Sequence, residues 1–514
     1  MIKIVEGMIW KMKENRAAGV DGINSTFIKK CCKGLVRPLR EIFRESMRVG
    51  EIPDAWKLAN VVAIFKKGAR WDPGNYRPVS LTSQIGKIME GIIKENLVDY
   101  LEGNGLFGKS QHGFRKNRSC LTNLLEFMEV VSNRLDKKEW VDVIYLDFKK
   151  AFDSVPHVRL LRKLEALGVR GEILRWIREW LRNRKQRVTL EGVESEWENV
   201  ISGVPQGSVL GPVLFAIYIE DIDEGVCSRM LKFADDTKVI GKSVTEEDVR
   251  VLREDLERLR EWSEKWQMGF NVDKCKVMYM GKGNSKAEYK LGNKVLEECN
   301  EEKDLGVVIS RNGKVEKQCA EAAKKGFKVL GMIARTFVTR KRNVILQLYK
   351  SLVRPLLDYC VQAWRPYRKK DIDLLERVQK RATRMVEECK ELDYEERLRR
   401  LGLTTLETRR LRADLVEVYK ILIGEEGVRR GDFFIGMTGK EGLVGGGRGG
   451  MRLRGNKWRL HKKRFRIDCA KYSFGNRVIK WWNKIPDSVI EGVGGIGGYK
   501  GRLDKLMRWD WGLK

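Results

Sequence analysis

Phe233-Ala234-Asp235-Asp236 places two adjacent carboxylates between two short apolar runs, Met230-Leu231 and Val239-Ile240. Apolar runs on both sides of a short polar turn predict a β-hairpin, with the two aspartates at its tip. Carboxylates held together in an apolar setting repel each other unless a cation neutralises them. Taken alone, an Asp-Asp pair is more often a solvated turn, so neighbouring motifs must decide between the two interpretations.

A third carboxylate follows a predicted buried strand upstream of the hairpin. Val143-Ile144-Tyr145-Leu146 is β-branched, aromatic and aliphatic, and Asp147 comes directly after it. A strand end is a fixed position for a side chain. Asp147, Asp235 and Asp236 together therefore predict a metal site built from carboxylates.

A proline- and glycine-containing turn lies between these two segments. Gly203-Val204-Pro205-Gln206-Gly207-Ser208 precedes an apolar stretch, 209–222, which is predicted to be a helix. Glycines at a helix start let backbone N–H groups approach a ligand, and a glutamine amide can pack on or hydrogen-bond to a nucleotide. An ordinary turn would have the same composition.

Basic residues follow a predicted strand near the N-terminus. The strand-like run 61–65 is followed by Lys66, Lys67 and Arg70, and Arg77 lies in a predicted turn, 75–81, that leads into a helix over 85–101. Cations beside a strand end and a turn are well placed to hold phosphate oxygens. A solvated basic loop is the simpler alternative.

The charge balance points to a polyanionic partner. The 514 residues include 102 Lys and Arg against 71 Asp and Glu, which leaves a net charge of +31. Nucleic acid is the first candidate. An anionic membrane surface is less favoured, because the excess charge is spread along the chain instead of being concentrated in one amphipathic helix.

Other patterns indicate a soluble intracellular protein. The ten cysteines include no Cys-x-x-Cys pair, which is typical of reduced thiols. The first residues do not form a signal peptide, and no apolar run approaches the length of about 18 residues needed to span a bilayer. The three histidines support neither a catalytic triad nor a zinc site.

The C-terminal half changes in character. Residues 313–430 have a helical pattern, and residues 436–455 are glycine-rich, as in a flexible linker. The tract 451–466 is basic and interleaved with Trp458, His461 and Phe465, which favours single-stranded nucleic acid over a solubilising tail.

These motifs together resemble those of a known family. Residues 147–153, 203–212 and 233–236 are similar to motifs A, B and C of reverse transcriptases, in the same order and with similar spacing. The chain most resembles the polymerase of a non-LTR retrotransposon (LINE) of the jockey-like group. Further segments resemble the family's finger motifs, motif D, primer grip, thumb and tail: 75–81, 111–115, 271–276, 305–309, 349–363 and 474–486.

The resemblance implies an α+β fold shaped as a right-hand polymerase. Residues 1–139 would form the fingers, and 140–312 the palm, an antiparallel sheet with helices that carries the catalytic motifs. Residues 313–435 would form a helical thumb, and 436–514 a Gly-rich linker with a basic C-terminal region.

The same resemblance implies an RNA-directed DNA polymerase that extends a DNA 3′ end on a retrotransposon RNA template with dNTPs. Asp147 and Asp235 would hold two Mg²⁺ ions roughly 3.5–4 Å apart, with Mn²⁺ as a substitute, and Asp236 would support the site directly or through its neighbours. The triphosphate would be bound by Lys66 or Lys67 and Arg77, with help from the backbone at Lys150 and Ala151. Phe152 would exclude a ribose 2′-hydroxyl, Gln206 and Gly207 would position nucleotide and template, and Lys274, or alternatively Lys276, would protonate pyrophosphate.

The partners implied are template RNA, primer DNA, their RNA–DNA hybrid and dNTPs, in the nucleus and in a cytoplasmic ribonucleoprotein. The proteins of full-length retrotransposons of this kind resemble a fusion of an apurinic-type endonuclease with the polymerase, and no such domain precedes residue 1. A truncated copy or partial gene model that needs a separate endonuclease for integration is therefore expected. Two alternatives stay open: an inactive nucleic-acid-binding remnant, and a group II intron maturase-like protein, whose maturase helices and HNH motif are not seen.

Overall fold

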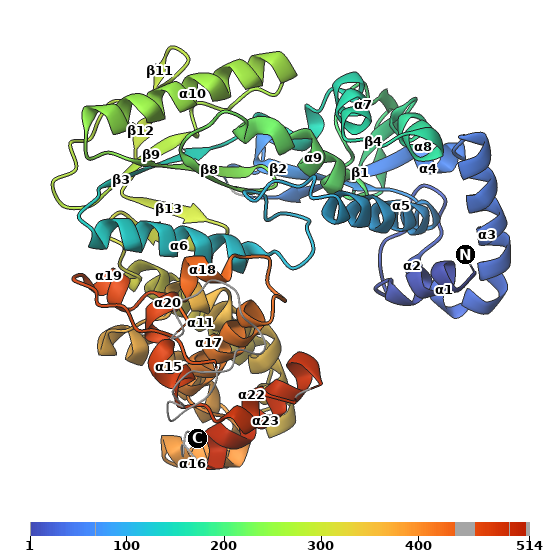
Figure 1. The fold of residues 1–514 in the computed structure, drawn as a ribbon. Coiled ribbons are helices and arrows are strands. Elements are labelled where there is room, and N and C mark those ends of the chain that lie inside the picture. The colour runs from blue at the N-terminus through green and yellow to red at the C-terminus, as the bar shows by residue number, and fades with distance from the viewer. Residues whose placement is uncertain (1, 67, 437–457, 493, 510–514) are drawn as a thin grey trace.

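The computed structural model describes residues 2–66, 68–436, 458–492 and 494–509. It has an α+β architecture in which two main sheets are surrounded by helices (Figure 1). The α+β class expected from the sequence is confirmed. All ten cysteines are free thiols. Among the described residues, no helix combines the length and the apolar character that crossing a membrane requires.

A five-stranded central sheet has the order β12-β9-β3-β8-β7. Its strands are β12 (Glu297–Glu298), β9 (Lys276–Met280), β3 (Val141–Leu146), β8 (Asp236–Lys242) and β7 (Arg229–Phe233). Neighbouring strands are antiparallel, as expected, except for the short parallel pair of β12 with β9.

The two faces of this sheet belong to two different hydrophobic cores. Val141 and Val143 of β3 join a core with α6 (Cys120–Asp136), whereas Ile144 and Leu146 join a core with α10 (Glu246–Trp266). This division follows from the two-residue repeat of a strand. Figure 1 shows α10 above the sheet and α6 below it. The sheet is therefore buried on both faces, which fixes the positions of its strand ends.

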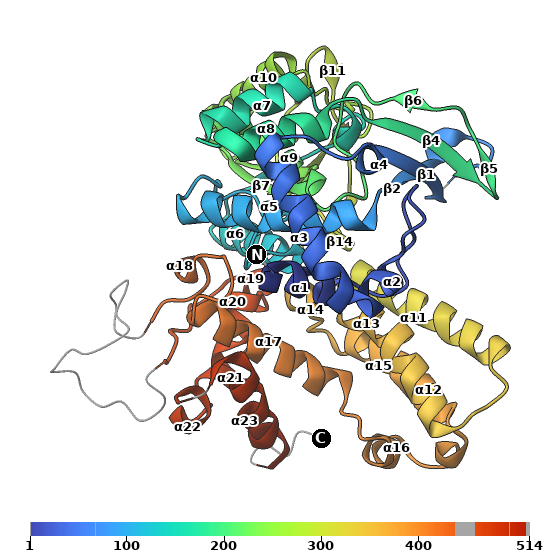
Figure 2. The ribbon, with the colours of Figure 1, turned by 90° about the vertical axis from the view of Figure 1, so that its right-hand side faces the viewer.

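A second sheet has the order β2-β1-β4-β5, with β6 also paired to β4 (Figure 2). Its strands are β1 (Leu58–Phe65), β2 (Tyr76–Leu81), β4 (Lys185–Leu190), β5 (Val193–Glu194) and β6 (Glu198–Asn199). Residues 75–81 were predicted to form a turn, and this prediction is wrong, because residues 76–81 pair with β1 as strand β2. The reversal of the chain occurs earlier, between β1 and Asn75.

Several helices pack around this second sheet and the adjoining face of the central sheet. Val5, Phe43 and Leu97 are buried in one shared core. The helices of this part of the chain are α1 (Ile2–Lys11), α2 (Ser25–Lys30), α3 (Cys32–Val49), α4 (Asp54–Lys57), α5 (Gln84–Gly103), α7 (His157–Ala166), α8 (Gly171–Leu181) and α9 (Gly211–Tyr218).

A hairpin of β13 (Glu301–Asp304) and β14 (Val307–Ser310) connects the central sheet to the helical region. A single strand over 304–309 is typical of this sequence, but the chain turns at Leu305 and Gly306, whose φ angles are 46° and 88°. Two successive residues with positive φ make the tight turn that joins antiparallel strands, and glycine accepts that conformation readily.

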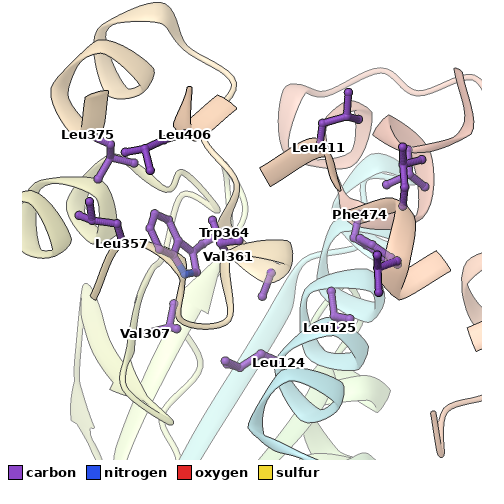
Figure 3. Packing of buried hydrophobic residues seen from close by; sticks show 14 of the residues in the cluster. Leu124, Leu125, Val307, Leu357, Val361, Trp364, Leu375, Leu406, Leu411 and Phe474 are labelled. Atoms are coloured by element: carbon purple, nitrogen blue, oxygen red, sulfur yellow. The ribbon is translucent and has the colours of Figure 1, made fainter. Parts of the chain in front are cut away.

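The region after β14 is helical, as predicted for 313–430. Its main helices are α11 (Glu316–Thr336), α12 (Arg342–Leu348), α13 (Arg354–Asp358), α14 (Val361–Trp364), α15 (Lys369–Arg384), α16 (Tyr394–Leu401), α17 (Leu406–Leu422) and α18 (Arg430–Phe433). Leu357, Leu375 and Leu406 are fully buried where these helices meet (Figure 3). This packing builds a helical body next to α6.

The C-terminal residues pack into the same core. Their helices are α19 (Asp468–Lys471), α20 (Phe474–Arg477), α21 (Ile479–Trp482), α22 (Asp487–Ile490) and α23 (Gly495–Trp509). Figure 3 shows Phe474 of α20 beside Leu125 of α6, and both are buried. Asp136 of α6 accepts hydrogen bonds from the backbone N–H groups of Arg466 and Ile467. The end of the basic tract is thus anchored to α6, while the glycine-rich segment expected as a linker lies outside the described residues, except Gly436.

Candidate active site

Strands β7 and β8 form the predicted hairpin. Phe233 pairs with Asp236, so Ala234 and Asp235 make a two-residue turn. Ala234 has a φ of 53°, a left-handed conformation that is uncommon for a residue with a side chain. Asp235 is half-buried and Asp236 is exposed. The prediction that this pair lies at a hairpin tip is confirmed.

Asp147 lies at the adjacent strand end. Leu146, the last residue of β3, pairs with Thr237 near the start of β8. Because β3 and β8 are antiparallel, the residue after β3 and the residue before Thr237 lie next to each other. The sheet therefore brings Asp147 to the aspartates of the hairpin.

Neighbouring carboxylates contribute to raised pKa values of both hairpin aspartates. Burial raises the pKa of Asp235, and the nearby Asp147 carboxylate raises it further. Although the Asp236 residue is exposed, the protein around its carboxyl group displaces part of the hydrating water and raises its pKa to about 6, with contributions from Asp235, Asp304 and Asp147. Negative charge is therefore concentrated here beyond what the surroundings neutralise, which is the condition under which a cation binds.

The donor set fits a hard divalent cation. Asp147 Oδ2 is buried and has no hydrogen-bond partner among the described residues, although the Asp147 side chain as a whole is 42% exposed. No cluster of three or more His, Cys, Asp or Glu side chains in metal-binding geometry occurs within the described parts of the chain. Magnesium is commonly bound by one or two carboxylates, and water and substrate phosphates complete its coordination. The pair Asp147 and Asp235 suits such an ion.

The segment before β9 holds the backbone of Asp147. Asn271 N–H donates to the Asp147 carbonyl at 2.7 Å, and Cys275 Sγ accepts from the Asp147 N–H at 3.4 Å. These contacts bring Lys274 Nζ to 3.4 Å from Asp147 Oδ2. Lys276 lies within β9 and pairs with Glu302 at 3.0 Å. Of the two lysines left open by the sequence, Lys274 is the one at the carboxylates.

Two basic residues in or next to the second sheet act electrostatically on Asp235. Both Arg77 and Lys66 lower the pKa of Asp235 through their positive charge, against the larger effect of burial. Lys66 lies just after β1, and its N–H donates to the Asn75 carbonyl at 2.8 Å, which closes the loop between β1 and β2. Lys67 lies outside the described residues. Lys66 and Arg77 are therefore close enough to Asp235 for their charges to affect it.

The glutamine-containing turn lies between β2 and the segment after Asp147. Ser80 N–H of β2 donates to the Gln206 carbonyl at 2.8 Å, and Val204 N–H donates to the Phe152 carbonyl at 2.7 Å. Gly207 has a φ of 134°, and a Cβ there would lie 2.4 Å from Ser80 O. Only glycine fits this close approach. Gln206 also lines a pocket of about 400 Å³ together with Ser80, Asp153 and Arg187.

Phe152 and its neighbours follow Asp147 closely. Lys150 has a φ of 46° and precedes a short 3-10 helix, Ala151–Asp153. Ala151 is buried, and Phe152 is half-buried against Phe215 of α9, with ring centroids 4.7 Å apart. The phenyl ring is thus held by stacking on the site side of α9.

Sequence reasoning missed two residues that hold these turns. Glu90 of α5 is 2% exposed, and its Oε2 accepts from the N–H groups of Val209 and Leu210 at the start of α9. Gln111 accepts from the backbone of the aspartate hairpin. Nothing local marks Glu90, whereas Gln111 lies in a segment, 111–115, that the motif pattern had singled out.

A comparison with protein families identifies the family of this chain. The family model "Reverse transcriptase (RNA-dependent DNA polymerase)" matches residues 64–334, which is more than half of the chain and contains the aspartates, Lys274 and the Gln206 turn. The chain belongs to the reverse transcriptase family.

Individual proteins with similar sequences show the same relationship. The chain is 28% identical over 376 residues to the RNA-directed DNA polymerase from mobile element jockey of Drosophila funebris, with 70% of this chain and 41% of that protein covered. The Drosophila melanogaster protein of the same description is 28% identical over 379 residues, with 70% and 41% covered. The resemblance to non-LTR retrotransposon polymerases is confirmed. The chain spans less than half of the length of these relatives.

Among solved structures, a telomerase of Candida tropicalis truncated from its C-terminal domain aligns with a TM-score of 0.35 and 13% identity, over 50% of this chain and 54% of that one. A TM-score this low has no bearing on the fold described above.

Proposed function

We propose that this chain is an RNA-directed DNA polymerase that extends a DNA 3′ end on an RNA template with dNTPs. The observation that carries the proposal is the meeting of Asp147 and the Asp235 hairpin at adjacent strand ends, where the charges of Lys66 and Arg77 also act on Asp235. Membership in the reverse transcriptase family supports it.

The proposal includes a right-hand arrangement. Residues 1–139 would form the fingers around the second sheet, 140–312 the palm around the central sheet, and 313–435 a helical thumb. One observation refines this division: α6 precedes residue 140 but packs on the central sheet, in one core with Val141 and Val143. In this arrangement α6 would pack against the palm on one side and against the thumb on the other.

Asp147 and Asp235 would hold magnesium, which manganese can replace, and Asp236 would add negative charge beside them. When bound, the metal supplies Lewis-acid stabilisation of the charge that develops on the reacting phosphate oxygens. Lys66 and Arg77 would bind the triphosphate, and the backbone at Lys150 and Ala151 would line its path.

Three further residues would act on the nucleotide and the leaving group. Lys274 would hold a proton at Nζ and donate it to the departing pyrophosphate. The Phe152 ring, fixed against Phe215, would exclude a ribose 2′-hydroxyl by its bulk. Gln206 and Gly207 would position the incoming nucleotide against the template, because their turn is anchored to β2.

The proposed partners are a template RNA, a primer DNA and the hybrid they form. The net charge of +31 supports a polyanionic partner of this size. Such a reaction would take place in the nucleus or in a cytoplasmic ribonucleoprotein, and the DNA 3′ end could come from a separate endonuclease.

Primer extension tests the proposal. The purified chain is incubated with a DNA primer on an RNA template, dNTPs and Mg²⁺, beside an Asp235→Asn variant and an Asp99→Asn control on the exposed surface of α5. We expect extension by the wild type and the control, and none by Asp235→Asn. A wild-type chain that binds the hybrid but adds no nucleotide would instead be a nucleic-acid-binding remnant.

A further inference from the structure

The segment Ser110-Gln111-His112-Gly113 pairs with β7 through a single β-bridge. Gln111 and Lys232 form a parallel bridge, in which His112 N–H donates to the Lys232 carbonyl and Lys232 N–H donates to the Ser110 carbonyl, both at 2.8 Å. The segment thus follows β7 up to the residue before the aspartate turn. Two backbone hydrogen bonds hold it in this position.

Asp223 ties the segment to β7. The Lys232 side chain is 0% exposed, and its Nζ donates to the Glu220 carbonyl and to Asp223. Asp223 also accepts from the hydroxyl of Ser110. Sliding the segment by one residue along β7 would break the bond from Ser110 to Asp223, so this bond favours the observed register.

In this position the Gln111 side chain reaches the turn itself. Its Oε1 accepts from Gly113 N–H at 2.7 Å and from Ala234 N–H at 3.1 Å. Gln111 is 0% exposed, and its Nε2 is buried without a hydrogen-bond partner in the described part of the chain. The glutamine is therefore held here through its oxygen, as an acceptor for two backbone N–H groups.

Gly113 also lies very close to the backbone of Ala234. A Cβ on Gly113 would lie 2.5 Å from Ala234 N. Ala234 is in the left-handed region, and a non-glycine residue keeps such a conformation only where its surroundings hold it. The φ and ψ angles of Ala234 set the direction in which the next residue, Asp235, projects.

We infer that Gln111 is a positioning residue that holds the Ala234–Asp235 turn in the conformation that aims Asp235 at the metal. Gln111 does not contact the reacting atoms, and acts through the Ala234 N–H. Gly113 allows the close approach on which this bond depends. The inference rests on the proposed function for its effect on nucleotide addition, but its effect on cation binding can be measured separately.

The test measures Mn²⁺ binding without turnover. The chain is bound to an RNA template with a primer that ends in a dideoxynucleotide, and free Mn²⁺ is followed by electron paramagnetic resonance. Gln111→Met keeps the length of the side chain but removes the strong acceptor, and we expect it to weaken Mn²⁺ binding by about 10-fold or more. Gln111→Glu keeps an acceptor for both N–H groups and adds negative charge, so it should bind Mn²⁺ at least as well as the wild type.

A matched control separates this effect from loss of stability. Gln379 of α15 is also buried, at 1% exposed, and its Oε1 accepts from the Tyr349 hydroxyl at 2.7 Å. Gln379→Met makes the same replacement in the helical region, and we expect it to lower the melting temperature with no change in Mn²⁺ binding. Melting temperature and affinity for the hybrid are measured for every variant.

The outcomes are distinct. Wild-type Mn²⁺ binding by Gln111→Met would overturn the inference, as would weak binding by a folded Gln111→Glu protein. If Gln111→Met does not fold, Gln111→Glu still decides. If the wild type binds Mn²⁺ in a Gln111-dependent way but adds no dNTP, the proposed polymerase activity fails and the positioning role stands.

Discussion

Lys274 Nζ lies 3.4 Å from Asp147 Oδ2, although the two residues are far apart in the sequence. The backbone bond from Asn271 to Asp147 maintains this approach. We expect Lys274→Ala to slow single-nucleotide addition by about 10²-fold or more, because a general acid is lost. Single-turnover kinetics with a saturating primer–template measures the chemical step.

Lys276→Ala is the matched control for that variant. Its ammonium is paired with Glu302 at 3.0 Å on β9, so its loss should change the rate by less than about threefold. A larger defect for Lys276→Ala than for Lys274→Ala would contradict the assignment.

Phe152→Val should admit ribonucleotides. The ring is held on Phe215, and removing it opens space where a 2′-hydroxyl would lie. We expect the preference for dNTP over rNTP to fall by roughly 10-fold or more, measured as the ratio of kcat/KM values. Phe148, which stacks on Phe270 at 4.8 Å, offers a control: Phe148→Val should lower stability and leave sugar selection unchanged.

Lys238→Met should destabilise the central sheet. Lys238 and Asp304 form an ion pair whose side chains are 4% and 6% exposed. Removing the cation leaves a buried carboxylate unpaired beside Asp236, at a cost of about 3–5 kcal/mol. Adding Asp304→Asn should recover much of the loss, and denaturation midpoints of the two single variants and the double variant give the coupling. Equal midpoints for the double variant and Lys238→Met would argue against it.

Glu417 predicts a pH-dependent loss of stability. It is 2% exposed, Lys420 Nζ lies 3.4 Å from its Oε2, and its Oε1 has no hydrogen-bond partner in the described part of the chain. Burial, together with the nearby Glu426 carboxylate, raises its pKa to about 7 from an ordinary value of 4.5. Between these values the folded state binds the proton that the unfolded state releases, so stability falls as pH rises from 4.5 to 7. The neutral amide of Glu417→Gln removes this dependence.

Melting temperatures at pH 5.5 and pH 8 check the Glu417 prediction. Glu417→Gln should be more stable than the wild type at pH 8, and the advantage should shrink at pH 5.5. Glu425→Gln, on the exposed surface beyond α17, serves as the control. An advantage that is the same at both pH values would mean that the Glu417 charge is not the cause.

Local patterns were sufficient for the elements that carry the aspartates. A β-branched run before Asp147 and two apolar runs around Asp235 and Asp236 predicted a strand and a hairpin, and β3, β7 and β8 have these positions. Local patterns were less reliable at 75–81. Asn75 and Pro78 are typical of turns, so a turn was predicted where the structure has strand β2. Pairing with β1, a partner outside the window, stabilises that strand.

Contacts between distant segments explain what could not be predicted. Lys274 and Lys276 have the same side chain and nearly the same sequence surroundings, yet only Lys274 lies at Asp147. Glu90 carries no local signal, and its role depends on α5 packing beside the start of α9.

The order and spacing of the motifs around Asp147, Gln206 and Asp235 were enough to indicate the family, which is confirmed. This inference depends on residue type and on short-range periodicity, which the sequence contains directly. Which side chains meet depends on the pairing of β3 with β8 and on the docking of Gln111 against Ala234. Such contacts are selected by the free energy of the whole fold, so they exist only once the sheet has formed and its cores have closed.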